Sequence, residues 1–282
     1  MGKRSEVLIK SMFCILLVNK YGGRKVGMFN LTFIKGGFLY LLCAGAGACV
    51  CAWAMPPASD YERHDIYGWQ VMISPNVKKD EALYQPILSQ LWLDLEMVND
   101  AIPESSLGFL KETTIWVEQG MPIAALNRTF FNGGRAITKK NGLVPESYGG
   151  VIIGNTKGYL AVTGIHPWQM LHELTHAFHQ FNLRHNYPPI KQAYQDAMSS
   201  KRFHNESDER IRGKAYATKN HKEYFSVLSE IYFGEKKFFP HNRKELAEHD
   251  PVGYCAVVKA WGLLGKQQGD SVPLVCSVES AK

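Results

Sequence analysis

The segment "MLHELTHAFHQF", residues 170–181, carries the pattern His-Glu-x-x-His inside an apolar stretch of helix-forming residues. In a helix, residues four apart share one face, so His172 and His176 can both point at one metal ion while Glu173 lies beside them. The apolar residues of the segment fall on the other side of the helix. The pattern therefore predicts a helix with one buried face and one histidine face.

The patterns around this helix predict an α+β domain over residues 55–282. Alternating or β-branched runs predict strands at 68–74, 113–118 and 149–156, and "YLAVTG" (159–164) is expected to extend or pair with the last of them. Residues 119–148 show no period and predict a long surface loop. Helices are predicted over 81–102, 167–183, 189–201, 220–233, 243–248 and 251–263. We expect a small mixed or antiparallel sheet beside the histidine helix and a mostly helical C-terminal half.

Residues 1–54 have the character of an export segment. The stretch "FIKGGFLYLLCAGAGACVCAWA", residues 33–54, has a lysine near its start, an apolar middle and an Ala-x-Ala end, which is the layout of a cleaved signal peptide. An apolar run of about twenty residues can also span a bilayer, so an uncleaved anchor through 33–54 is the alternative. We expect a secreted protein that contacts a membrane only if this segment stays uncleaved.

The charge distribution supports a boundary near residue 54. The chain has a formal net charge of +6, and residues 1–54 hold seven Lys or Arg and one acidic residue, which leaves 25 basic and 25 acidic residues in the remainder. A nucleic-acid-binding domain usually carries a clear basic excess. The neutral balance of residues 55–282 therefore argues against a nucleic-acid partner.

Two cysteines, Cys255 and Cys276, remain in the predicted domain. In an exported protein an even pair suggests one disulfide that fixes the C-terminal tail. Two buried free thiols are an equally good interpretation. Neither cysteine belongs to a Cys-x-x-Cys pattern that would bind zinc.

A catalytic zinc ion takes three protein ligands and keeps a fourth position open for water, so a third ligand has to come from elsewhere in the chain. The segment "YATKNHKEYFSVLSEIYF", residues 216–233, predicts a helix from about Asn220 that presents Glu223 and, two turns later on the same face, Glu230. Either carboxylate could complete the site. Glu223 could equally complete a capping box by reaching back to the amide of Asn220.

His179 lies one turn beyond His176 and is a further candidate. A fourth protein ligand would occupy the water position of a catalytic site. We therefore expect His179 close behind the ligands or in solvent.

From Trp168 to about Trp261 the chain resembles the gluzincin zinc peptidases, in particular the catalytic domain of the anthrax lethal factor family and related secreted bacterial metallopeptidases. The resemblance lies in "HELTH" and, some forty residues later, in "YATKNHKEYF" (216–225), where Tyr216 precedes Glu223 by seven residues. It covers about a third of the chain. The resemblance implies a zincin-like fold, with His172, His176 and Glu223 as zinc ligands, Glu173 as general base and Tyr216 as a hydrogen-bond donor to the transition state.

Two further residues are expected behind the ligands, Asn220 and Glu230. Glu230 is expected to orient a ligand histidine through its other ring nitrogen, or else to be a solvated helix residue. The chain departs from the family at Lys219, where threonine is usual, and at Ser226 and Val227, where an acidic residue is common. These departures affect details around the ligands and not the ligands themselves.

The sequence thus predicts a secreted, monomeric zinc peptidase that hydrolyses peptide bonds of a peptide or protein substrate. Glu173 and Tyr216 argue against a catalytically silent zinc-containing binding module, because a purely structural zinc needs neither a base nor an oxyanion donor. A zinc hydrolase of a non-peptide amide substrate is a further alternative. The strand expected just before the histidine helix favours the peptide substrate.

Overall fold

The computed structural model describes residues 54–122, 128–204, 215–264 and 276. The chain divides between Ala52 and Trp53, and every described residue belongs to the second unit, Trp53–Lys282. The predicted export segment lies outside the described residues, apart from Ala54. None of the helices within the described ranges combines the length and apolar character that a membrane span needs.

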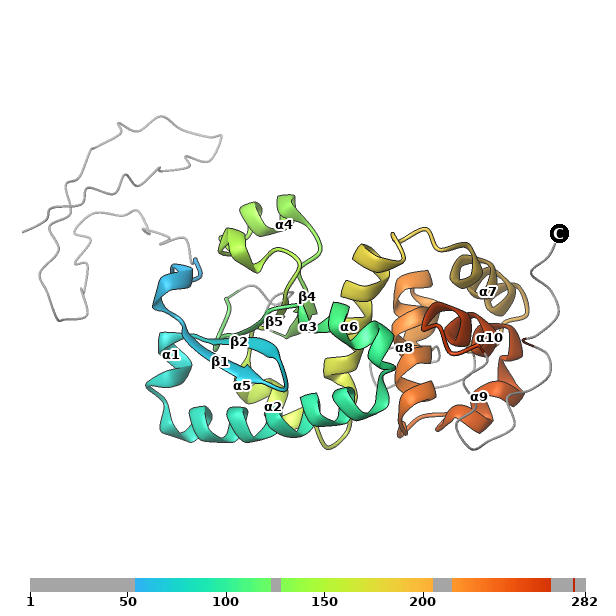
Figure 1. Ribbon diagram of the computed structural model, residues 1–282, viewed down its shortest axis with the longest axis horizontal. Coiled ribbons are helices and arrows are strands. Elements are labelled where there is room, and N and C mark those ends of the chain that lie inside the picture. The colour runs from blue at the N-terminus through green and yellow to red at the C-terminus, as the bar shows by residue number, and fades with distance from the viewer. Residues whose placement is uncertain (1–53, 123–127, 205–214, 265–275, 277–282) are drawn as a thin grey trace, which may run out of the picture. The chain divides into compact units, whose positions relative to one another are not determined.

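Five strands in the described part of the chain form one mixed sheet in the order β1-β2-β3-β5-β4 (Figure 1). β1 pairs antiparallel with β2, the central strands β2, β3 and β5 run parallel, and β4 pairs antiparallel with β5 at the end of the sheet. This arrangement confirms an α+β protein with a mixed sheet. The strands are β1 Glu62–Ile66, β2 Trp69–Ile73, β3 Ile115–Val117, β4 Thr129–Phe131 and β5 Val151–Ile153.

The central strands are buried on both faces, which explains their nearly continuous apolar sequence. Along β3, Ile115 and Val117 join the larger core, which the helices share. Trp116, between them, points to the opposite face and joins a smaller cluster with Tyr61 and Leu143. The sheet is therefore filled on both sides and forms a rigid support for the helices that pack on it.

Helices surround the larger core and make up most of the C-terminal half (Figure 1). In the first half these are α1 Pro75–Lys78, α2 Glu81–Ala101, α3 Glu104–Lys111, α4 Arg135–Lys140 and α5 Thr156–Val162. In the second half they are α6 Gln169–Ala177, α7 Pro188–Ser199, α8 His221–Phe233, α9 Arg243–His249 and α10 Pro251–Ala260. The predicted helices of the C-terminal half are confirmed, with ends shifted by a few residues.

Two predictions about elements are wrong, and one strand was not predicted. "YLAVTG" belongs to helix α5 and not to a strand, because the side chain of Asn155 accepts a hydrogen bond from Gly158 N and caps the helix start. The predicted loop 119–148 contains both β4 and α4. β1 was not predicted at all, since this edge strand is polar over most of its length and shows no apolar alternation.

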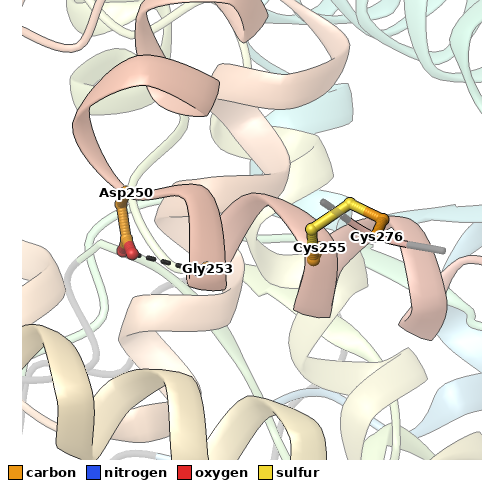
Figure 2. Close-up of a disulfide and its surroundings, with 4 residues drawn as sticks. All are labelled: Asp250, Gly253, Cys255 and Cys276. Atoms are coloured by element: carbon orange, nitrogen blue, oxygen red, sulfur yellow. Dashed lines mark hydrogen bonds between the residues drawn. A yellow bond between two sulfur atoms is a disulfide. The ribbon is translucent and has the colours of Figure 1, made fainter. Parts of the chain in front are cut away.

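The buried carboxylate of Asp250 joins α8 to α10, and Figure 2 shows its hydrogen bond to Gly253 of α10. Asp250 accepts a hydrogen bond from the Tyr224 hydroxyl at 2.5 Å and another from Gly253 N at 3.0 Å, so it caps α10 while it holds α8. Cys255 of α10 forms a disulfide with Cys276. The structure therefore confirms the disulfide, and the interpretation as two free thiols is wrong.

Replacing Gly253 by alanine should destabilise the fold. An added Cβ would lie 2.3 Å from the Tyr224 hydroxyl and 2.5 Å from Asp250 Oδ2, so the buried hydrogen bonds would have to shift. We expect Gly253→Ala to lower the free energy of unfolding by about 1–3 kcal/mol, measured by urea denaturation. The matched control is Gly108→Ala on α3, where a Cβ meets no atom within 4 Å. Equal stability of the two variants would contradict the tight packing at Gly253.

Candidate metal centre

Helix α6 presents its histidines from a buried position. Met170, Leu171 and Leu174 are fully buried in the larger core, so the face that carries His172 and His176 is turned toward α8. At its C-terminal end α6 continues into a π-helical turn, η3 Phe178–Asn182, a distortion that is frequent at functional sites. The amphipathic pattern of the sequence thus places both imidazoles on one helix face, as predicted.

Helix α8 lies beside α6 and brings the acidic groups to the histidines (Figure 1). Its start is fixed by Asn220, whose Oδ1 accepts hydrogen bonds from Lys222 N at 2.9 Å and Glu223 N at 3.1 Å. Glu223, Ser226 and Glu230 follow at spacings of three and four residues, so they share one helix face. All three contact the histidines of α6.

The Glu223 carboxylate meets both histidines at one oxygen. Its Oε2 atom lies 3.1 Å from Nε2 of His172 and 3.1 Å from Nε2 of His176. The ligand atoms of the three residues all lie within 4.8 Å of one another, which makes them a group that could hold a metal ion. Two ligands about 2.0–2.1 Å from a tetrahedral zinc ion lie about 3.3 Å apart, so a small shift would fit the ion.

The outer ring nitrogen of each histidine also has a partner. Nδ1 of His172 lies 2.5 Å from Glu230 Oε1, and Nδ1 of His176 lies 3.3 Å from Ser226 Oγ. Such partners orient the rings and direct the Nε2 atoms toward the ligand position. The structure therefore places Glu230 behind His172 and Asn220 at the start of the helix that carries Glu223.

The carboxylates and imidazoles of this group shift one another's pKa values. Burial by itself would lower the pKa of His172, but the carboxylates of Glu230 and Glu223 raise it to about 9. Burial would raise the pKa of Glu223, but hydrogen bonds from both histidines hold that pKa well below its usual range. Zinc takes one carboxylate and neutral imidazoles as ligands, so binding of the ion would release the proton that the carboxylates hold on His172.

Tyr216 and Lys219 contact the other oxygen of Glu223. The Tyr216 hydroxyl donates to Oε1 at 3.2 Å, and Lys219 Nζ donates to the same atom at 2.7 Å and to the Tyr216 hydroxyl at 2.9 Å. Burial raises the pKa of Tyr216, although the Lys219 ammonium opposes this. The phenol stays protonated and is available as a hydrogen-bond donor beside the metal group.

Glu173 is linked to the end strand of the sheet. Its Oε2 atom accepts a hydrogen bond of 2.9 Å from Phe131 N of β4, and its carboxylate is mostly buried. The neighbouring residue on the helix, His172, points to the metal group. A main-chain hydrogen bond from β4 therefore holds Glu173, the general-base candidate. This bond lies outside the group formed by His172, His176 and Glu223.

His179 lies behind the site and is fully buried. Neither of its ring nitrogens has a hydrogen-bond partner among the described residues, and its ring packs against those of His185, His221 and Phe225. Burial and the neighbouring histidines lower the pKa of His179 to about 3. The structure does not bring His179 into the metal group, and at neutral pH it is an uncharged core residue.

Four contacts of the site were not predicted: those of Ser226, Lys219 and Phe131 described above, and that of Lys236, whose Nζ lies 3.1 Å from Glu230 Oε2. Spacing could have identified two of them, since Ser226 lies three residues after Glu223 and Lys219 lies four residues before it. Phe131 is 42 residues from Glu173 in sequence. No local pattern could have indicated the contacts of Phe131 and Lys236.

Comparisons with protein-family models, with curated proteins and with solved structures return no match to this chain.

Substitution of the two acidic residues of α8 should separate their roles. Glu223→Ala removes a ligand atom and should abolish tight zinc binding, whereas Glu230→Ala leaves all three ligands and should weaken it about 10–100-fold. Calorimetric titration of zinc into the full-length chain measures both, with Glu104→Ala on the first turn of α3 as control. Zinc binding that survived Glu223→Ala but not Glu230→Ala would reverse the assignment.

Proposed function

We propose that this chain is a zinc-dependent peptidase of the gluzincin type, with a zincin-like catalytic domain. The observation that carries the proposal is the convergence of His172, His176 and Glu223, in which one carboxylate oxygen lies 3.1 Å from both imidazole nitrogens. Glu173 and Tyr216 lie beside this group and supply the two further functions that peptide hydrolysis requires.

The residues around the group fit zinc. Two imidazole nitrogens and one carboxylate oxygen form the three-ligand set of catalytic zinc sites, which leaves a position for water. Each histidine is oriented through its second nitrogen, His172 by Glu230 and His176 by Ser226. We propose His172, His176 and Glu223 as the zinc ligands.

In the proposed mechanism, zinc bound to these ligands would lower the pKa of a water molecule toward about 7 and polarise the substrate carbonyl. Glu173 takes the proton of the attacking water and delivers it to the departing amine. Tyr216 turns its hydroxyl from Glu223 Oε1 to the oxyanion that develops on the carbonyl, where the hydrogen bond counts most in the transition state. Lys219 keeps Oε1 of Glu223 hydrogen-bonded when the tyrosine turns away.

The position of β4 supports an extended peptide as substrate. Asn132 N donates to Gly150 O and Gly154 N donates to Arg128 O, so the alternate residues Thr129 and Phe131 direct their main-chain groups away from β5. An extended peptide could pair as an added strand with the main-chain groups of this edge other than Phe131 N, which donates to Glu173. This edge lies beside Glu173, since Phe131 N contacts its carboxylate.

We further propose that the protein is exported and acts as a monomer. The Cys255–Cys276 disulfide supports export, because disulfides persist mainly in oxidising compartments. The sequence of residues 1–54 is the second support, either as a cleaved signal or as an anchor.

The main test is Glu173→Gln. This substitution keeps the shape of the side chain but removes the base, so we expect full zinc content and loss of peptide cleavage. Zinc is measured by elemental analysis of the full-length chain, and cleavage by mass spectrometry of a mixed peptide library. Glu146→Gln, on the exposed surface, is the matched control. Undiminished cleavage by Glu173→Gln would exclude the proposed mechanism, and zinc without cleavage in the unmodified protein would favour a binding module or a non-peptide substrate.

Tyr216→Phe should slow turnover without loss of metal. Removal of one oxyanion donor typically lowers kcat about 10²–10³-fold, and we expect a fall of about 10²-fold with unchanged zinc content. Steady-state kinetics on a peptide cleaved by the unmodified protein give the value. Tyr67→Phe, which loses a surface hydrogen bond to Glu96, is the control. An unchanged kcat for Tyr216→Phe would remove the tyrosine from the mechanism.

A further inference from the structure

The segment after α8 brings a lysine back to the metal group. Lys236 Nζ lies 3.1 Å from Glu230 Oε2, and the two side chains are only 8% and 3% exposed. The other oxygen of the same carboxylate, Oε1, contacts His172 Nδ1 at 2.5 Å. A chain of polar contacts thus runs from Lys236 through Glu230 to His172, whose Nε2 atom is a proposed metal ligand.

The main chain around Lys236 is held in place by contacts of its own. At Gly234 an added Cβ would lie 1.8 Å from Trp168 Nε1, so the end of α8 packs directly on the residue that precedes α6. Lys236 N donates to His241 O at 2.7 Å, and His241 Nδ1 lies 3.0 Å from Lys236 O. The loop is closed on itself, which limits where the lysine side chain can reach.

We propose that Lys236 is a positioning residue of the metal centre, which holds the Glu230 carboxylate in the orientation that directs His172 Nε2 toward the metal. The inference rests on the proposed function in one respect, the assignment of His172 as a ligand. Lys236 lies outside both the His-Glu-x-x-His helix and the face of α8 that carries Glu223 and Glu230.

Lys236 can position Glu230 because the Glu230 carboxylate is a buried negative charge. Lys236 contacts one of its oxygens and His172 contacts the other. A carboxylate inside a protein is held best when both oxygens are hydrogen-bonded, and the loss of one charged partner leaves the remaining charge poorly compensated. Without Lys236, Oε2 of Glu230 would lose its charged partner, and the carboxylate would be held less firmly in its present orientation. His172 would then lose the fixed ring orientation that a metal ligand needs.

A purely structural ion pair would have a different consequence. Lys236 would then stabilise the loop, but its removal would leave the affinity and geometry of the metal site unchanged. Metal affinity and the absorption spectrum of a cobalt(II) ion bound in place of zinc therefore separate the two roles. Both report on ligand geometry and not on overall stability.

The experiment compares Lys236→Met, Lys236→Arg and the control Lys237→Met in the full-length chain. Zinc dissociation constants are measured by competition with a chelator, cobalt(II) spectra are recorded, and far-ultraviolet circular dichroism checks folding. We expect Lys236→Met to weaken zinc binding at least about 10-fold and to change the cobalt spectrum. Lys236→Arg, which keeps the charge, should stay within about 3-fold of the unmodified protein, and exposed Lys237→Met should match it.

The inference is overturned if folded Lys236→Met binds zinc with unchanged affinity and an unchanged cobalt spectrum. If Lys236→Met does not fold, the double variant Glu230→Gln/Lys236→Met, which removes both charges of the pair, decides: an affinity equal to that of Glu230→Gln alone supports action through Glu230, and a further loss contradicts it. Peptide cleavage is measured on the same preparations. Zinc binding without cleavage would reject the peptidase but not Lys236, whereas absence of zinc binding in the unmodified protein would reject both.

Discussion

The contact between α6 and α8 is the constraint on which the site depends. One buried carboxylate oxygen, Glu223 Oε2, faces the Nε2 atoms of two histidines at the same distance. Such an arrangement is unfavourable unless the surrounding groups supply or accept protons, or a cation takes the shared position. Every other feature of the site serves to keep these three side chains together, from the asparagine that starts α8 to the sheet that supports α6.

The groups that hold the site come from distant parts of the chain. β4 contributes a main-chain amide to Glu173, α8 contributes partners for both histidines, and the loop after α8 returns with Lys236. Precise placement of reactive groups requires that their own neighbours be fixed by packing and hydrogen bonds. The geometry of the site therefore depends on the whole domain. A substitution in β4 or in the loop after α8 is expected to change it.

The sequence predicts helix α6 and the placement of its histidines in full, because two histidines four residues apart on an amphipathic helix leave little freedom in where they point. Glu223 could be chosen over Glu230 only through the resemblance to gluzincins, since both lie on one helix face. The contacts of Phe131 and Lys236 depend on how β4 and the loop after α8 pack, which no local pattern encodes. The short run "YLAVTG" suits a strand or a helix equally by periodicity, and a single capping residue, Asn155, decides between them.

The Cys255–Cys276 disulfide has a consequence for the integrity of the chain end. The twenty residues between the two cysteines are a covalently closed loop, so a single backbone cut anywhere among them does not release the terminal segment. The fragment beyond the cut stays attached to α10, which packs in turn on α7, α8 and α9. A nicked molecule would keep its mass, apart from one added water, until a reductant opened the bridge.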